Sequence, residues 1–215
     1  MNCTIVVIDD HELVLDGTVN LLKDHYPDAT IQIAQTRQAG QALIEQLQPD
    51  LVVVDLSIPE SEGDTARFET GIELLKTLMQ CYPTLNIVVQ SMNPKPLVRL
   101  KPMIDDHEGG FTIADKKLRR DEMLTKLDMA LKGGTFLPKE MKLGLEVKPE
   151  WLELLRLAYQ EGLQDKAIAK EMNISDRTVR NYWTKVQDAL SVYPEDNQNL
   201  RTQVGIRARE EGLID

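Results

Sequence analysis

The stretch IVVIDD, residues 5–10, is a short apolar run that ends in two adjacent aspartates. The pattern returns in LVVVD, residues 51–55, and a third run, IVV at residues 87–89, is soon followed by Ser91. Strands that are covered on both faces of a parallel sheet read as near-continuous apolar runs of this kind. The three runs therefore predict the central strands of a parallel sheet.

Two further β-branched or aromatic runs, residues 31–33 and 111–113, complete a set of five predicted strands. Amphipathic segments follow four of the strands and predict helices at 12–25, 37–47, 71–82 and 119–132. In the second of these helices, Ala39, Leu43 and Leu47 share one face and are expected to be buried. Such alternation predicts an α/β fold with a doubly wound (βα)5 sheet.

Two segments depart from this alternation. Residues 60–70, ESEGDTARFET, form a polar excursion that is longer than the usual loop between a strand and a helix. Residues 92–109 contain Pro94, Pro96 and Pro102, and proline interrupts a helix because it lacks a backbone N–H. We expect the fourth helix to be short, broken or displaced.

The pattern changes after Gly133-Gly134, which is a typical helix end. Residues 1–134 are predicted to form the first domain, 135–148 a linker and 149–215 a second domain without strands. Four helices are predicted there, at 150–160, 165–172, 176–190 and about 200–211. The second domain is therefore expected to be all-α.

The charge of the chain is uneven. The 215 residues carry a net charge of −10, which argues against a uniformly basic nucleic-acid coat and against attraction to anionic membranes. Residues 1–136 contribute −8 of this charge and residues 137–215 only −2. Two cysteines are too few for a disulfide framework, and no apolar run is long enough to span a membrane. These features predict a cytoplasmic protein without a membrane partner.

Polar residues gather where the predicted strands end. Asp9, Asp10 and Asp55 follow the first and third strands, and Ser91 and Lys116 follow the fourth and fifth. Ligands of open parallel sheets bind beyond these carboxyl ends. Like charges about 4 Å apart repel by about 4 kcal/mol at an effective dielectric of 20, so three carboxylates would hold a proton or a cation. Oxygen ligands with open positions suit Mg²⁺, and a carboxylate beside it is a plausible nucleophile toward a phosphoryl group.

An enzyme that uses an aspartate nucleophile is the competing interpretation. A phosphatase of this kind typically has a second acid two residues after the nucleophile, but Ser57 stands there, and no glycine-rich phosphate loop follows the first strand. We therefore predict that the chain is not an enzyme. His11, His25 and His107 are expected to be surface or packing residues rather than ligands.

The first half of the chain resembles the receiver domain of response regulators, of the flavodoxin-like fold. VVIDDHELVLDG is similar to the opening of receivers in the NarL/LuxR subfamily, and VVVDLSIPE looks like their phosphoacceptor strand. The resemblance implies that Asp55 accepts phosphate from a sensor histidine kinase, and that Asp9, Asp10, Asp55 and the Ser57 carbonyl hold Mg²⁺. Ser91 matches the family's switch hydroxyl.

Lys116 matches the conserved lysine of that family, with Lys117 as a rival for the role. The aromatic switch position, three residues before the lysine, is Ile113, although another alignment of the strand would place Ala114 there. The Gly-x-Glu-Leu pattern of the family arrives late, at Gly71, which makes residues 60–70 look like an insertion. These departures leave open how, or whether, phosphorylation is coupled to output.

The second half has the pattern of a helix-turn-helix. Ser175 can cap the helix that begins at 176, and Val179, Trp183, Val186 and Leu190 give that helix an apolar face. Residues 166–186 carry a net charge of +3 inside an otherwise acidic module. The outer face of the helix is rich in arginine, asparagine, threonine and lysine, which are suited to base edges and phosphates.

This half resembles the LuxR/NarL-type DNA-binding domain, and ISDRTVRNYWTKV is close to its recognition-helix signature. The outer face and the resemblance together predict seven contacts to double-stranded DNA: Arg177, Thr178, Arg180, Asn181, Tyr182, Thr184 and Lys185. The last helix of the family often serves dimerisation, so a homodimer is expected here.

The sequence thus predicts a transcriptional regulator of a two-component system, with Asp55 as the phosphoacceptor. The alternative is an atypical receiver whose DNA binding is controlled by a partner or by phosphate-independent dimerisation. Ile113, the insertion and the three prolines motivate that alternative.

Overall fold

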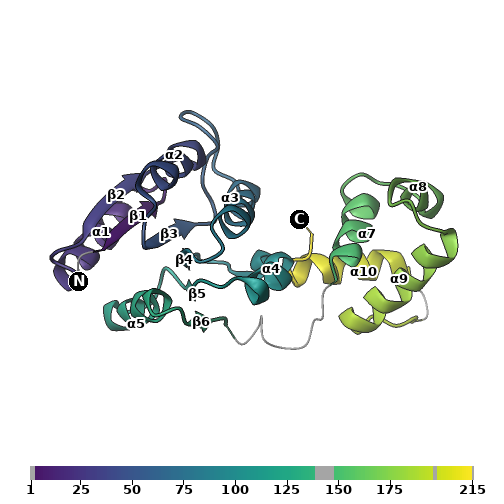
Figure 1. Ribbon diagram of the computed structural model, residues 1–215. Coiled ribbons are helices and arrows are strands. Elements are labelled where there is room, and N and C mark those ends of the chain that lie inside the picture. Colours follow the sequence, from purple (N-terminus) through teal and green to yellow (C-terminus); the bar gives the residue numbers. More distant parts are fainter. Residues whose placement is uncertain (1–2, 139–147, 196–197, 215) are drawn as a thin grey trace. The chain divides into compact units, whose positions relative to one another are not determined.

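The computed structural model describes residues 3–138, 148–195 and 198–214 and divides into two compact units (Figure 1). The first, called the sheet unit, comprises Met1–Pro94 and Met103–Pro138. The second, called the helical unit, comprises Lys95–Pro102 and Lys139–Asp215. Most of the predicted linker, residues 139–147, lies outside the described residues.

The sheet unit is built on a parallel sheet with the strand order β2-β1-β3-β4-β5-β6. Its strands are β1 (Thr4–Ile8), β2 (Thr30–Ala34), β3 (Leu51–Asp55), β4 (Asn86–Gln90), β5 (Phe111–Ala114) and β6 (Thr135–Phe136). β3 is buried along its whole length, and β1 and β4 are buried except at their first residues. The doubly wound α/β fold predicted from these apolar runs is confirmed.

The prediction of five strands was wrong by one, because β6 pairs with β5 at the edge of the sheet. Phe111 lies opposite Thr135 and Thr112 opposite Phe136. A strand of two residues is too short to show any hydrophobic period. Its pairing depends instead on a position next to β5 that only the folded chain provides.

Helices cover both faces of the sheet (Figure 1). The covering helices are α1 (Glu12–His25), α2 (Arg37–Leu47), α3 (Phe68–Cys81) and α5 (Arg120–Leu131), and a short helix, α4 (Lys101–Asp106), precedes β5. Leu15 and Leu22 of α1 share a buried cluster with Met123 and Leu127 of α5, which places these two helices on the same face. α2 and α3 contact each other.

The expected irregularity of the fourth helix is confirmed. A 3₁₀ helix, η1 (Lys95–Leu100), leads into the short α4. The three prolines remove backbone donors from this region, so a continuous α-helix cannot form. The Lys95–Pro102 segment belongs to the helical unit.

The predicted buried face of α2 was wrong by one position. Gly40 and Ile44 are buried, whereas Ala39 is exposed. A Cβ atom at Gly40 would lie 2.5 Å from the Ile8 Cδ1 atom, so α2 approaches β1 through a glycine. Glycine does not count as a hydrophobic residue in a hydrophobicity pattern. The pattern therefore predicted the adjacent face of α2 as the buried one.

Residues 60–70 form an ordered excursion between β3 and α3. An isolated antiparallel bridge joins Ile58 to Arg67, and Ser61 donates a 2.6 Å hydrogen bond to Asp64. Arg37 of α2 forms a 2.9 Å ion pair with Glu60. α3 begins at Phe68, three residues before the predicted start, so the excursion is shorter than the sequence suggested.

The helical unit contains α7 (Pro149–Tyr159), α8 (Asp165–Glu171), α9 (Asp176–Leu190) and α10 (Leu200–Glu210). The described residues of this unit include no strand, which agrees with the all-α prediction. Leu154, Ile168, Val179 and Val204, one from each helix, meet in a common core. Within the described residues of the whole chain, no helix is long and apolar enough to cross a membrane.

Candidate functional site

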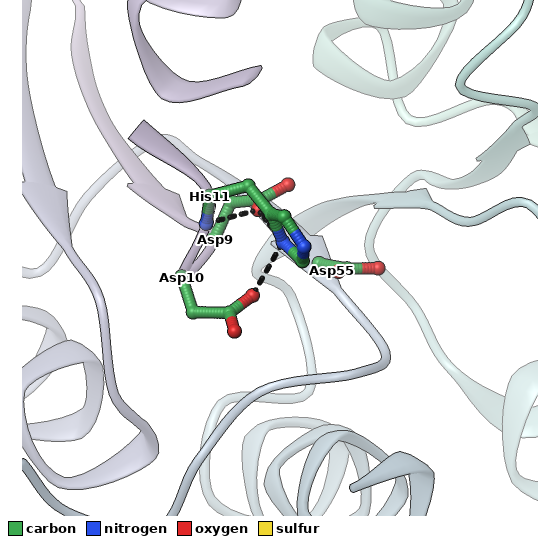
Figure 2. A group of neighbouring side chains, drawn as sticks. All are labelled: Asp9, Asp10, His11 and Asp55. Carbon is green, nitrogen blue, oxygen red and sulfur yellow. Dashed lines mark hydrogen bonds and ion pairs between the residues drawn. The ribbon is translucent and has the colours of Figure 1, made fainter. Parts of the chain in front are cut away.

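Three aspartates converge at the carboxyl ends of β1 and β3 (Figure 2). One ligand atom from each of Asp9, Asp10, His11 and Asp55 lies within 4.8 Å of all the others. β1 and β3 are adjacent and parallel, with Ile8 opposite Val54, so the residues that follow them must be neighbours. The expected convergence of Asp9, Asp10 and Asp55 is present.

Lys116 bridges two of these carboxylates. Its Nζ atom lies 2.7 Å from Asp9 Oδ2 and 2.8 Å from Asp55 Oδ2. Asp9 and Asp55 are 1% and 5% exposed, so a buried like-charged pair is held together by one ammonium group. The backbone N–H of Lys117 donates to Asp115, and the exposed Lys117 is not part of this arrangement.

Burial is the largest single influence on the pKa values of Asp55 and Lys116, but their mutual contacts act against it. Desolvation raises the pKa of Asp55 above its ordinary value, against the lowering effects of Lys116 and of a backbone hydrogen bond from Ser57. Desolvation lowers the pKa of Lys116, but its contacts with Asp55 and Asp9 outweigh this effect and the net pKa is raised. The ammonium is therefore firmly protonated, and the site holds one fixed positive charge among its acids.

The donor set fits a hard divalent cation such as Mg²⁺. The Oδ1 atom of Asp10 is buried but accepts no hydrogen bond, although His11 Nδ1 lies 2.7 Å away without hydrogen-bond geometry. Burying a carboxylate oxygen that accepts no hydrogen bond costs free energy unless a cation binds to that oxygen. Asp9 and Asp55 add oxygens of the type that Mg²⁺ prefers.

His11, predicted from the sequence to be a surface or packing residue, lies beside the acids. Its side chain is 63% exposed, as expected of a surface residue, yet its Nδ1 atom also lies 3.3 Å from Asp9 Oδ1. Its backbone N–H donates to the same Asp9 oxygen at 2.9 Å. Adjacency to the Asp9-Asp10 pair was the signal that could have placed it here.

An open cavity of about 220 Å³ adjoins the acids. Its lining residues are His11, Val14, Asp55, Ser57, Phe68, Ser91, Met92 and Lys116. Ser91 is 1% exposed, and its Oγ atom accepts a hydrogen bond from the Asn93 N–H. The structure thus brings the predicted Asp55, Ser57, Ser91 and Lys116 to one cavity, which is large enough for a phosphoryl group.

The residue at the expected aromatic switch position is fully packed. Ile113 lies on β5, opposite Val89 of β4, and is 3% exposed. A β-branched side chain in a strand has few rotamers available to it. A swing of this side chain between inward and outward positions is therefore not accessible without repacking β5.

In the helical unit, α8 and α9 are joined by a tight turn. Asn173 adopts a positive φ of 52°, and the Ser175 hydroxyl accepts a 3.1 Å hydrogen bond from the Thr178 N–H. The predicted cap of α9 is confirmed. The buried residues of α9 are Val179, Trp183, Val186 and Leu190, as the apolar stripe indicated.

The opposite face of α9 is polar and accessible. Five of the seven residues predicted to contact nucleic acid are exposed: Arg177, Arg180, Asn181, Thr184 and Lys185. Thr178 and Tyr182 are only partly exposed, and Tyr182 packs against the core of the unit. The N-terminal half of α9 therefore presents two guanidinium groups and an amide to solvent.

Arg201 of α10 ties three helices of this unit together. Its guanidinium lies 3.3 Å from the centroid of the Trp183 ring, and its Nη2 atom donates to both carboxylate oxygens of Asp165, at 2.8 and 2.9 Å. Trp183 Nε1 donates to the same carboxylate at 3.2 Å. The orientation of α9 is thus fixed against both α8 and α10.

The acidic cluster, the bridging lysine and the parallel sheet agree with one known family. Residues 5–128 match the model of the response regulator receiver domain. The chain belongs to this family. The match includes the β1 acids, Asp55 and Lys116, and it ends within α5.

Two transcriptional regulatory proteins match this response regulator over most of their length. The transcriptional regulatory protein YdfI of Bacillus subtilis is 25% identical over 227 aligned residues, which cover 98% of this chain and 97% of YdfI. The transcriptional regulatory protein RcsB of Salmonella typhi is 30% identical, with 83% of each chain covered. These relatives are transcriptional regulators rather than enzymes, in agreement with the prediction for this chain.

Solved structures support the two-part fold. An RcsB–DNA complex has a TM-score of 0.59 and 24% identity, and the match covers 97% of this chain and 98% of that chain. A structure of RcsB from Salmonella enterica serovar Typhimurium, bound to promoter rprA with the phosphomimetic BeF₃⁻, has a TM-score of 0.55 at 25% identity. This response regulator therefore shares its fold with RcsB.

Proposed function

We propose that this response regulator binds double-stranded DNA through α9 and is controlled by phosphorylation of Asp55 by a sensor histidine kinase. The observation that carries the proposal is the convergence of Asp9, Asp10, Asp55 and Lys116 beside a cavity of about 220 Å³. A homodimer in the cytoplasm is the form that we expect to act on DNA.

The chemistry is transfer of a phosphoryl group from nitrogen to oxygen. A carboxylate oxygen of Asp55 attacks phosphorus, the P–N bond of the donor breaks, and the nitrogen leaves with the electron pair and takes up a proton. Lys116 and Ser91 line the same cavity as Asp55, and in this proposal their ammonium and hydroxyl groups contact the phosphoryl oxygens. Mg²⁺ held by Asp9, Asp10, Asp55 and the Ser57 carbonyl would supply positive charge for these oxygens.

Replacing Asp55 with asparagine should abolish phosphorylation, because the amide is not a nucleophile at this site. Wild-type protein incubated with Mg²⁺ and phosphoramidate should gain the mass of one phosphoryl group, measured on the intact chain. Asp64→Asn, a change at an exposed aspartate of the excursion, should label like wild type. Equal labelling of Asp55→Asn and wild type would show that another residue is the acceptor.

The DNA-binding proposal depends on α9. Arg177, Arg180 and Asn181 lie exposed near its N-terminal end, where recognition helices contact base edges. Arginine pairs well with guanine and asparagine with adenine, while Thr184 and Lys185 are suited to phosphates. The net charge of +3 over residues 166–186 favours this face over the acidic remainder of the chain.

Replacing Arg180 with alanine should weaken binding to a selected DNA site by about 1–3 kcal/mol if the guanidinium contacts a base. Fluorescence anisotropy with a DNA fragment selected by the wild-type protein measures the change. Arg120→Ala removes the same charge from α5 of the sheet unit and should leave the affinity almost unchanged. Undiminished affinity of Arg180→Ala would remove this residue from the interface.

A second mode of control is supported by the buried Ile113, which cannot act as a swinging aromatic switch. In that mode, a partner or phosphate-independent dimerisation controls DNA binding. DNA affinities of wild type and Asp55→Asn, each with and without phosphoramidate, separate the two modes. A gain confined to phosphorylated wild type supports phosphorylation control, and four equal affinities support the second mode.

A further inference from the structure

Phe68 is an aromatic residue at the edge of the cavity that adjoins Asp55. It is the first residue of α3, at the point where the excursion passes into that helix, and it lines the cavity together with Ser57 and Lys116. Its side chain is half-buried. The ammonium of Lys116 can bind phosphate oxygens, whereas the Phe68 ring has no group that donates a hydrogen bond to them. The ring therefore contributes apolar surface to the cavity rather than a ligand.

Two close backbone approaches hold Phe68 in place. On its N-terminal side, the Arg67 N–H donates a 3.1 Å hydrogen bond to the Ile58 carbonyl. On its C-terminal side, a Cβ atom at Gly71 would lie 2.1 Å from the Leu56 carbonyl oxygen, so α3 approaches this backbone as closely as a glycine allows. Residues three apart share a face of a helix. Phe68 is therefore on the side of α3 that meets the backbone after β3.

The excursion before Phe68 is also anchored at its start. The Arg37 N–H, in the first turn of α2, donates a 3.0 Å hydrogen bond to the Pro59 carbonyl. The Arg37 guanidinium contacts both oxygens of the Glu60 carboxylate, at 3.0 and 2.9 Å. Both ends of the excursion are thus fixed to backbone of the sheet unit. Phe68 is held at the cavity rather than carried by a free loop.

A phosphoryl group on Asp55 is consumed by reaction with water. In this hydrolysis a water oxygen forms a bond to phosphorus, and the bond between phosphorus and the Asp55 carboxylate oxygen breaks. The electron pair of that bond returns to the carboxylate, and the protons of the water stay with the inorganic phosphate that leaves. The rate depends on the access of water to phosphorus, and apolar surface at the cavity excludes water without offering it a hydrogen bond.

We propose that Phe68 shields a phosphoryl group on Asp55 from water and thereby lengthens the lifetime of the adduct. This inference rests on the proposed function, because it requires Asp55 to carry the phosphoryl group. Phe68 takes no part in the transfer itself. The acids, Ser91 and Lys116 stay in place when the ring is removed, so variants of Phe68 should still accept phosphate from a small donor.

The lifetime of the adduct is measured on the full chain, with Phe68→Leu and Phe68→Ala. Each protein is labelled with Mg²⁺ and phosphoramidate, and the donor is removed by rapid desalting. Intact-chain mass spectrometry then follows the fraction that keeps the added mass. Leu13→Ala is the matched control, because Leu13 is apolar, 88% exposed and adjacent to the cavity residue Val14 but does not itself line the cavity.

We expect the adduct of Phe68→Ala to decay roughly fivefold or more faster than that of wild type, since water reaches the phosphoryl group more easily. Phe68→Leu should lie between the two, and Leu13→Ala should match wild type. In urea that unfolds the sheet unit, the four adducts should decay alike because the cavity is gone. Equal decay of folded Phe68→Ala and wild type overturns the inference, and so does a difference that persists in urea. If Phe68→Ala lacks the far-UV circular dichroism of the folded chain, the comparison of Phe68→Leu with wild type decides in the same way.

The labelling step separates a failure of this inference from a failure of the proposed function. Adducts that form on every variant and decay at one rate leave phosphorylation of Asp55 standing and remove the role of Phe68. If wild type forms no adduct, the proposed function is wrong, and this inference is wrong with it.

Discussion

Replacing Lys116 with methionine is expected to lower the free energy of unfolding of the sheet unit by about 3–5 kcal/mol at neutral pH without Mg²⁺. The side chain is 14% exposed and its ammonium contacts Asp9 and Asp55, whose side chains are 2% and 5% exposed. Methionine keeps most of the volume but leaves two buried carboxylates facing each other without a cation. Denaturant unfolding followed by far-UV circular dichroism measures the loss.

The deficit of Lys116→Met should depend on pH and on Mg²⁺. Burial already raises the pKa of Asp55, and Lys116 opposes this rise, so the pKa rises further in the variant. An acid whose pKa is raised by folding favours the folded state when protonated and loses that contribution as the pH rises through the folded pKa. The deficit relative to wild type should therefore shrink as the pH falls. Mg²⁺ should shrink it too, because binding to the folded state adds positive charge and stabilises that state.

Lys117→Met is the matched control for this prediction. Lys117 is the adjacent residue and is exposed, and its replacement should change the unfolding free energy by less than about 0.5 kcal/mol. Equal stabilities of Lys116→Met and Lys117→Met would mean that the two carboxylates are not both charged in the folded chain. A deficit that does not vary with pH would point to lost packing rather than to unpaired charge.

Replacing Trp183 with alanine should destabilise the helical unit by about 3–5 kcal/mol. The ring is 3% exposed, so the change leaves a large cavity under α9. It also removes the ring that stacks with the Arg201 guanidinium at 3.3 Å and meets Tyr159 edge-on at a centroid distance of 6.0 Å. The Asp165–Arg201 pair remains, but the tie between α9 and that pair is lost.

Tryptophan fluorescence reports this unit selectively, because the two tryptophans of the chain, Trp151 and Trp183, both belong to it. Trp151 therefore monitors unfolding of the Trp183→Ala variant. Tyr193→Ala, at an aromatic residue that is 61% exposed, should change the unfolding free energy by less than about 0.5 kcal/mol. A loss below about 1 kcal/mol for Trp183→Ala would show that α9 is positioned mainly by its aliphatic contacts.

The parts of the fold that the sequence predicted are those with strong local signals. The apolar runs before Asp9 and Asp55 marked two central strands, and parallel pairing then required their acids to meet at one edge. Ser175 marked the start of α9 because a hydroxyl at that position satisfies a free N–H of the first turn. In each case a few neighbouring residues carry the information.

The parts that the sequence did not predict depend on contacts between distant residues. β6 exists because Thr135 lies beside Phe111, and the face of α2 is set by the fit of Gly40 against Ile8. The packing of residues 95–102 with the end of α10 leaves no periodic signal in either segment. Proline content alone indicated that the fourth helix would be irregular, but not what the irregular segment would contact.

The sheet ends on a strand of only two residues, and this has a consequence for self-association. The unpaired edge of a strand is a template to which another chain can add. β6 occupies part of the β5 edge, and the Lys126 ammonium lies 2.9 Å from the centroid of the Phe136 ring. So short a strand, with a charged group over its aromatic side chain, offers few backbone groups for intermolecular pairing. Thr135 and Phe136 thus disfavour edge-to-edge pairing at the β5 side of the sheet.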